Sequence, residues 1–204
     1  MFISVNPVNP QPRLIRQIVE CLQQGGVIIY PTDTTYGIGC DIFNRKGVKK
    51  IFQIKQRDSK KPFSFICSDL AEISNYAQVS NFAFKIMKRH LPGAYTFVLE
   101  ATKIVPDSLS TKQKTVGVRI PDNAICQAIV KELGHPLVTT SANVAGEVTP
   151  QDPRDINDRM GRMVDYVIDG GISMDEASTV ISLLDDRIEI LRQGSGDSSW
   201  IEQA

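Results

Sequence analysis

The chain has 204 residues, 42% of them hydrophobic, and Lys+Arg and Asp+Glu both count 23. These values predict one soluble globular domain with a single core, and they exclude a protein that binds nucleic acid through a general basic excess. The four cysteines are widely spaced, and neither a signal-peptide pattern nor an apolar run of about 18 residues is visible, so we expect a cytoplasmic protein with reduced thiols and no membrane association.

Hydrophobic periodicity predicts helices and strands that alternate along the chain. In order, we expect a helix from Pro12 to a stop near Gly25, a strand over 27–30, a helix over 45–56, a strand over 63–67, a helix over 80–91, strands over 95–99 and 115–120, a helix over 123–133, a strand over 137–140, a helix over 153–160, a strand over 164–168, and a final strand pair over 178–184 and 188–192. This interleaving predicts an α/β fold with a mixed sheet in one domain over residues 1–194, followed by a loosely held polar tail over 195–204.

The stretch Tyr30-Pro31-Thr32-Asp33-Thr34-Thr35-Tyr36-Gly37-Ile38-Gly39-Cys40 carries the most information. It is typical of a buried strand that runs into a polar loop, with a glycine at each bend. Three threonines and one aspartate at a strand end would place many donors beside one cleft. Such a loop suits a small ligand with anionic groups, although turn geometry alone would also select these residue types.

Two further polar groups follow the first loop along the chain. Lys55-Gln56-Arg57 places two cations at the end of a predicted helix, and Ser141-Ala142-Asn143 forms a polar turn after a predicted strand. Each has a simpler interpretation, as a solvated helix end and as a helix cap or turn. Together with the threonine-rich loop, the two groups indicate a nucleotide or phosphate site.

The strand over 115–120 adds a third pair of candidates. Thr115 and Arg119 share one face of that strand by period-two spacing, and an arginine there either meets solvent or neutralises an anion; the same two interpretations hold for Arg192. His90 and His135 do not lie in a nucleophile signature. Neither a P-loop nor a dinucleotide fingerprint is present, and the acidic residues indicate no metal site.

Taken in order, the motifs resemble the YrdC/YciO family, the threonylcarbamoyl-AMP synthase group. The resemblance covers roughly residues 10–194, and the matching segments are residues 25–37, 55–57, 92–99, 115–121, 141–143, 169–171, 178–180 and 192–194. It implies a single-domain, twisted, open, mixed β-sheet flanked by helices, of the YrdC/RibB-like type, with a concave basic cavity.

The resemblance also implies an activity. Studied members use ATP, bicarbonate and L-threonine to make threonylcarbamoyl-adenylate and pyrophosphate, and the product feeds a tRNA adenosine modification carried out with partner proteins. Mg²⁺ is expected with ATP, held mainly by phosphates and water. Joining a carbamate to the α-phosphate of ATP needs cations and aligned donors more than a protein nucleophile.

Where the motifs match, the resemblance also implies which residues of this chain form the site. The resemblance implies that Lys55 and Arg57 grip the triphosphate as the catalytic pair. It assigns ATP to Lys55, Arg57, Lys61, Thr115, Ser141, Asn143, Thr149 and Arg192. It assigns L-threonine to Thr34, Arg119, Thr139 and Ser178, with Arg119 on the carboxylate and Thr139 acting through its backbone.

The chain departs from the family pattern in three places. It has Lys61-Pro62-Phe63 where many members have Asn-Pro-Leu, it has Ile66 where some have a histidine, and it stops soon after Arg192, without the extra domain of longer members. Its intervening segments are most similar to the YciO branch. A YciO-like protein that binds double-stranded RNA, tRNA or nucleotide without synthase activity therefore remains an alternative, as does a carbamoyl-transfer relative with another acceptor.

Overall fold

The computed structural model describes residues 1–55, 63–106, 109, 113–143 and 147–203. Within these residues the helices are α1 (Pro12–Gln23), α2 (Arg45–Lys55), α3 (Leu70–Tyr76), α4 (Asn81–His90), α5 (Ala124–Leu133) and α6 (Pro153–Met160), with short 3₁₀ turns η1 (Leu184–Asp186) and η2 (Ser199–Gln203). The strands are β1 (Phe2–Ser4), β2 (Ile28–Tyr30), β3 (Gly37–Asp41), β4 (Ser64–Ile66), β5 (Tyr95–Glu100), β6 (Thr115–Arg119), β7 (Leu137–Ser141), β8 (Tyr166–Asp169), β9 (Thr179–Ser182) and β10 (Glu189–Arg192).

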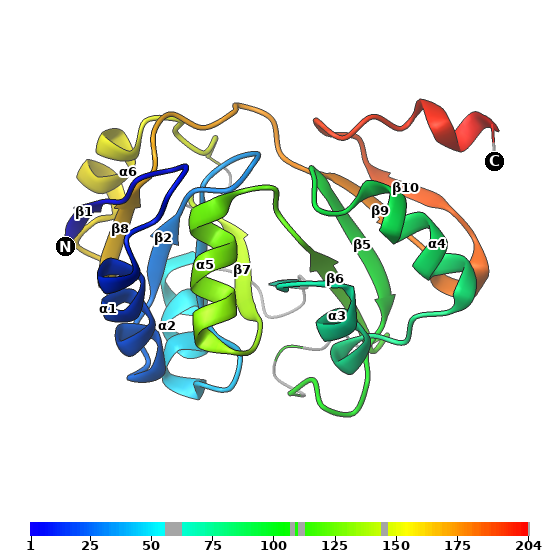
Figure 1. The fold of residues 1–204 in the computed structure, drawn as a ribbon, viewed down its shortest axis with the longest axis horizontal. Helices are drawn as coiled ribbons and strands as arrows, with labels where there is room; N and C mark the ends of the chain where they lie inside the picture. Colours follow the sequence, from blue (N-terminus) through cyan, green and yellow to red (C-terminus); the bar gives the residue numbers. More distant parts are fainter. Residues whose placement is uncertain (56–62, 107–108, 110–112, 144–146, 204) are drawn as a thin grey trace.

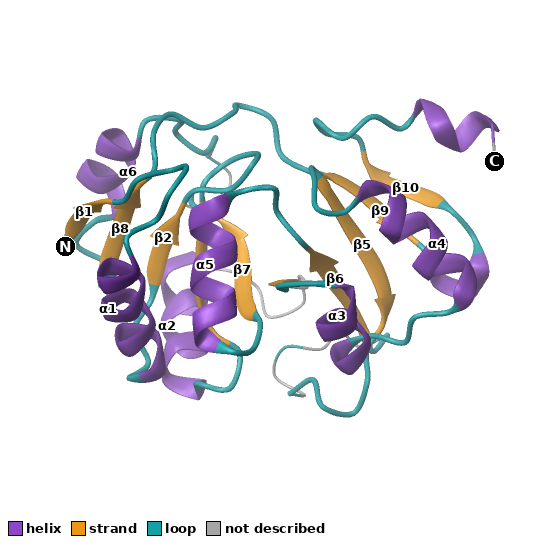
Figure 2. Cartoon of the chain, in the orientation of Figure 1, coloured by secondary structure: helices purple, strands orange, loops and turns teal. Residues whose placement is uncertain are grey.

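All the described strands form one open, twisted, mixed sheet flanked by helices, which confirms the predicted fold class (Figures 1 and 2). The strand order is β1-β8-β2-β3-β7-β4-β6-β5-β9-β10. Strands β8, β4 and β9 run parallel to β2, β6 and β5, whereas β3 is antiparallel to both β2 and β7. Strands far apart in the sequence therefore become neighbours, such as β2 with β8, β3 with β7, and β5 with β9.

Two apolar clusters cover the two faces of the sheet unequally. One cluster joins α2, α3, α4 and α6 to side chains such as Ile29, Phe65, Phe97 and Val118, and it spans nearly the whole sheet. The other joins α1 and α5 to Ile28, Tyr30 and Ile66, and it includes no residue of β5, β6, β9 or β10. Because strand side chains alternate between faces, this second face of those four strands lies outside both apolar clusters.

Two elements were missed by the sequence analysis. Strand β1 pairs in parallel with β8 through Ile3 and Ile168, although only three residues take part. Helix α3 had a usable signal: the Asp69 carboxylate accepts a hydrogen bond from the Glu72 backbone N–H, and the Glu72 carboxylate accepts one from Ser68 N. This aspartate-glutamate spacing is typical of a helix start.

The prediction that residues 31–39 form a loop was wrong at its C-terminal end. Residues 37–41 form β3, hydrogen-bonded to strands on both sides. Gly37 and Gly39 lie under the ring of Tyr30, and an added Cβ would come within 3.1 Å of that ring at Gly37 and 3.0 Å at Gly39. At Gly39 the added Cβ would also come within 2.6 Å of the Val138 carbonyl of β7, so these glycines serve close approach to both neighbouring strands rather than a bend.

The expected loose tail is also wrong, because residues after Gly194 pack on the domain. The Tyr95 hydroxyl donates to the Asp197 carbonyl over 2.8 Å, and the Trp200 ring stacks on His90 with centroids 4.3 Å apart. All four cysteines are free thiols in the structure, and Cys40, Cys67 and Cys126 are buried. Within the described ranges, none of the helices has the length and apolar character needed to cross a membrane.

Candidate active site

A cavity of about 450 Å³ lies on the face that α1 and α5 leave uncovered. Its walls come from seven consecutive strands of the sheet, β3 to β10, and from the end of α2. Its volume is in the range typical of small-molecule sites. The structure brings together eight of the predicted site residues in its lining: Lys55, Thr115, Arg119, Thr139, Ser141, Asn143, Ser178 and Arg192.

Lys55, the last residue of α2, holds the turn after β7. Its ammonium donates to the Ser141 carbonyl over 2.7 Å, to the Asn143 carbonyl over 2.6 Å and to Asn143 Oδ1 over 2.5 Å. Ser141 Oγ donates to the same Asn143 Oδ1 over 2.7 Å. Lys55 is only 4% exposed, which excludes its interpretation as a solvated helix end. It lines the cavity while fixing the polar turn, because a buried ammonium needs oxygen partners.

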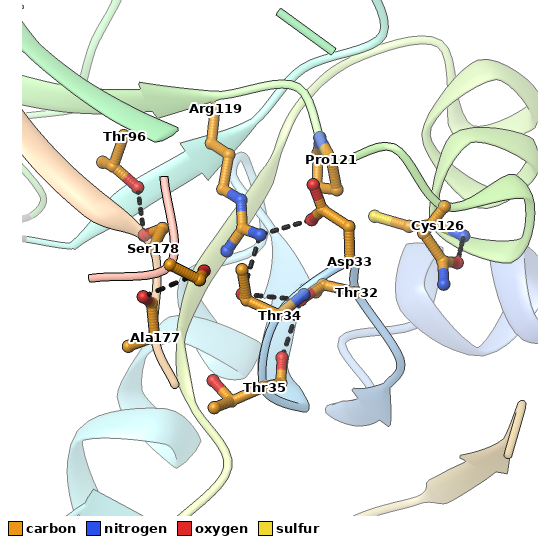
Figure 3. Close-up of polar contacts among 12 residues, drawn as sticks. Thr32, Asp33, Thr34, Thr35, Thr96, Arg119, Pro121, Cys126, Ala177 and Ser178 are labelled. Carbon is orange, nitrogen blue, oxygen red and sulfur yellow. Dashed lines mark hydrogen bonds and ion pairs between the residues drawn. The ribbon is translucent and has the colours of Figure 1, made fainter. Parts of the chain in front are cut away.

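Arg119, at the end of β6, points toward the residue 32–35 loop (Figure 3). Its Nη2 donates to the Asp33 carboxylate and to Thr34 Oγ1, the latter over 2.7 Å. The guanidinium and the Asp33 carboxylate form a buried ion pair, with side chains 9% and 12% exposed. Asp33 is absent from the cavity lining, so it supports Arg119 from behind. Among the described residues, Arg119 Nε has no hydrogen-bond partner.

The loop that carries Asp33 is fixed by its own hydroxyls. Thr32 Oγ1 donates to the Thr35 carbonyl over 2.7 Å and accepts from Thr34 N over 3.1 Å. This hydroxyl-backbone bonding is typical of threonine in turns. Thr34 does not line the cavity itself and reaches it only through Arg119.

Ser178 joins three strands at the far wall of the cavity. Its hydroxyl lies 2.9 Å from Thr96 Oγ1 of β5, and its carbonyl accepts from Arg192 Nη2 over 2.8 Å and from Nε over 3.2 Å. Burial, and then the nearby positive charge of Arg119, lower the pKa of Arg192. Two guanidinium groups therefore face one space, which favours an anion between them.

Thr139 is oriented from below by Tyr30. The Tyr30 hydroxyl donates to Thr139 Oγ1 over 2.6 Å, and both side chains are buried. Burial raises the pKa of Tyr30 well above its ordinary value, so the phenol stays protonated and donates at neutral pH. Thr139 Oγ1 is thereby an acceptor toward Tyr30, and its own proton is directed elsewhere.

Replacing Tyr30 with phenylalanine should lower the free energy of unfolding by about 1–2 kcal/mol, because it leaves a buried hydroxyl without its donor. Urea unfolding measures the change. Tyr166→Phe is the matched control: it removes a 2.8 Å hydrogen bond from Gln17 outside the cavity. A stability change below about 0.3 kcal/mol for Tyr30→Phe would show that the Tyr30–Thr139 bond is not important.

Besides Thr34, three predicted residues are not in the cavity lining that the structure describes. Thr149 lines a second, open hollow with Asp152, Asp155 and Arg159, so its expected nucleotide contact is not supported by its position. Arg57 and Lys61 lie outside the described residues. Ser64 and Thr96 also line the cavity, but they are ordinary strand positions without a motif and were not predicted, and Asp33 had been given no separate role.

Comparison with known proteins decides the family. The Sua5/YciO/YrdC family model, described as "Telomere recombination", matches residues 20–194. The chain belongs to this family. YciO of Escherichia coli K12, an uncharacterized protein, is 44% identical over 198 residues, 96% of each chain. The crystal structure of E. coli YciO superposes with a TM-score of 0.93 at 43% identity and covers 98% of both chains.

Other members of the Sua5/YciO/YrdC family carry a named activity or ligand. A putative threonylcarbamoyl-AMP synthase of Methanocaldococcus jannaschii is 36% identical over 199 residues, 95% of this chain and 92% of the relative. The crystal structure of P. abyssi Sua5 complexed with L-threonine has a TM-score of 0.93 at 27% identity, and the match covers all of this chain and 60% of that one.

Proposed function

We propose that the protein is an ATP-dependent L-threonylcarbamoyladenylate synthase, which converts L-threonine, bicarbonate and ATP into threonylcarbamoyl-AMP, pyrophosphate and water. The observation that carries the proposal is the grouping of Lys55, Arg119 and Arg192 in one hydroxyl-lined cavity. Among its described lining residues there is no carboxylate. Relatives named threonylcarbamoyl-AMP synthases, and a related structure with L-threonine, support the same reaction.

The reaction needs two anions held together. The amine of threonine attacks the carbon of bicarbonate to form a carbamate with loss of water, and a carbamate oxygen then attacks the α-phosphorus of ATP while pyrophosphate leaves. In the proposed site Arg119 binds the threonine carboxylate, and Ser178 and Thr139 bind around it. Lys55 and Arg192 stabilise the phosphate charge that develops during the displacement. Arg57 and Lys61 are proposed to join them on the triphosphate.

Mg²⁺ would enter with the phosphates of ATP and screen their charge. The described residues hold no group of three or more His, Cys, Asp and Glu side chains suited to a metal ion. The donor set of the cavity, cations and hydroxyls, fits a phosphate chain that brings its own ion. The protein's part is to bind the phosphates and exclude water from the carbamate.

Product detection tests the proposal. With ATP, L-threonine and isotopically labelled bicarbonate, the label should appear in a species that contains both AMP and threonine. L-Serine and L-alanine should give less of the corresponding product. Label that stays in bicarbonate, with folded protein at high concentration, would contradict the proposal.

A YciO-like binding function is the second candidate. It is favoured by the identity to YciO of E. coli, which exceeds the identity to the relatives named as synthases above. Such a protein would bind nucleotide, tRNA or double-stranded RNA without making the adenylate. ATP alone should raise the melting temperature of the synthase and of a nucleotide-binding protein but not of one that binds only RNA, whereas L-threonine-dependent turnover belongs to the synthase alone.

A further inference from the structure

The residues after Gly194 lie beyond the matched family region and fold back over the wall of the cavity. Figure 1 shows this C-terminal segment in red above the ends of β5 and β9, beside α4. The family match ends at residue 194. The segment 195–203, here called the tail, thus lies C-terminal to the matched region and contacts the cavity wall.

The tail forms hydrogen bonds with the two residues on either side of Ser178. Ser195 N donates to the Ala177 carbonyl over 2.9 Å, and Thr179 Oγ1 donates to the Gly196 carbonyl over 2.6 Å. The same threonine hydroxyl accepts from Gly194 N over 3.1 Å and is buried. Ala177 and Thr179 are therefore both fixed by the C-terminal segment, and the position of Ser178 between them follows.

An aromatic anchor holds the tail in place. The Trp200 ring lies nearly parallel to the His90 ring, at 23° with centroids 4.3 Å apart, and its Nε1 donates to the Asp197 carbonyl over 2.9 Å. The Tyr95 hydroxyl donates to that same carbonyl over 2.8 Å. Trp200 and Ile201 also pack against the larger apolar cluster. An aromatic stack with hydrogen bonds is worth more than a polar surface contact.

We propose that the tail is a positioning element of the cavity. Its docking sets the start of β9, so that the Ser178 hydroxyl meets Thr96 and the Ser178 carbonyl receives Arg192. In the proposed function these residues bind L-threonine and ATP, and the ligand effects below rest on that function. Small displacements of such groups reduce ligand affinity and rate because the donors no longer meet their acceptors.

The test uses Trp200→Ala and a chain that ends at Gly194. In both, amide hydrogen exchange should become about 10-fold faster or more over residues 177–181 and stay unchanged in β2 and β3. The KM for L-threonine should rise about 10-fold, with kcat changed less than about threefold. Trp200→Phe, which keeps a ring against His90, should restore most of the affinity, and a chain that ends at Ile201 should match the full protein.

The possible outcomes distinguish a failure of the tail proposal from a failure of the proposed function. Unchanged exchange over residues 177–181 in the shortened chain, or faster exchange across the whole sheet in Trp200→Ala, would overturn the positioning role. The first result would make the tail a passive cover, and the second a general support of the fold. Failure of the full protein to bind L-threonine, with local exchange changes as expected, would contradict the proposed function and leave the positioning role of the tail supported.

Discussion

Replacing Lys55 with alanine should lower ATP turnover by about 100-fold or more, because it removes a cavity cation and the three hydrogen bonds that hold the Ser141–Asn143 turn. The protein should remain folded. Hydrogen bonds to a charged group contribute about 1.5–3 kcal/mol, and cavity water replaces part of that loss, so we expect the free energy of unfolding to fall by about 1–3 kcal/mol. Pyrophosphate release and urea unfolding measure the two effects separately.

Lys50→Ala is the matched control on the same helix. The Lys50 ammonium pairs with the Asp165 carboxylate over 2.7 Å, with side chains 33% and 39% exposed, away from the cavity lining. Removing a partly exposed pair costs about 0–1 kcal/mol and should leave turnover unchanged. If Lys55→Ala keeps wild-type turnover, Lys55 has no catalytic role. If the variant unfolds, the role of Lys55 is structural.

Removing the charge of Arg119 should weaken L-threonine binding about 100-fold and ATP binding by less than about fivefold. Arg119→Ala alone would confuse the result, since an uncompensated buried Asp33 carboxylate costs about 3–5 kcal/mol of stability. The double variant Asp33→Asn with Arg119→Gln removes both charges and keeps similar volumes. Isothermal titration with each ligand measures the two affinities.

Asp33→Asn alone serves as the control for that double variant. It keeps the guanidinium and the Thr34 contact of Arg119, and it changes only the group behind the cavity. L-Threonine affinity should stay within about tenfold of the wild-type value, because a positioning contact contributes less than the charged contact itself. Equal loss of ATP and L-threonine affinity in the double variant would contradict the assignment of Arg119 to the amino-acid carboxylate.

Much of the fold follows from periodicity and turn chemistry in the sequence. Apolar spacing located the helix at Pro12–Gln23 and the strand at Thr115–Arg119, with Thr115 and Arg119 on one face as expected. Strand β3 could not be found in this way. Its Gly37 and Gly39 have turn propensity, and only their close contacts with the Tyr30 ring of β2 and with β7 explain them as strand residues.

The motifs of the candidate site could be predicted from the sequence, but their arrangement in space could not. Ser178, Arg119 and Ser141 belong to β-sheet regions separated by long stretches of chain, and the sheet order that unites them depends on crossovers that local sequence does not encode. The charges in the sequence likewise do not show which residues each charged side chain contacts in the folded chain. Lys55 is a buried helix-end residue that holds the Ser141–Asn143 turn, and Asp33 is the counterion of Arg119; both facts require the folded chain.

The expected basic character of the cavity remains a prediction. Lys55, Arg119 and Arg192 line it, but the Asp33 carboxylate neutralises one of the three cations. The field that a phosphate chain meets therefore depends on Lys55 and Arg192, and on the contribution proposed for Arg57 and Lys61. Variants at Lys55 should therefore mainly affect ATP, whereas variants at Arg119 should mainly affect L-threonine.

The most direct test of the account is pyrophosphate release from ATP by the purified protein, in bicarbonate buffer, with and without L-threonine. The account predicts release that requires both bicarbonate and L-threonine and that is lost in Lys55→Ala. A folded protein that binds ATP but releases no pyrophosphate in response to L-threonine would contradict the synthase function and favour nucleotide or RNA binding instead.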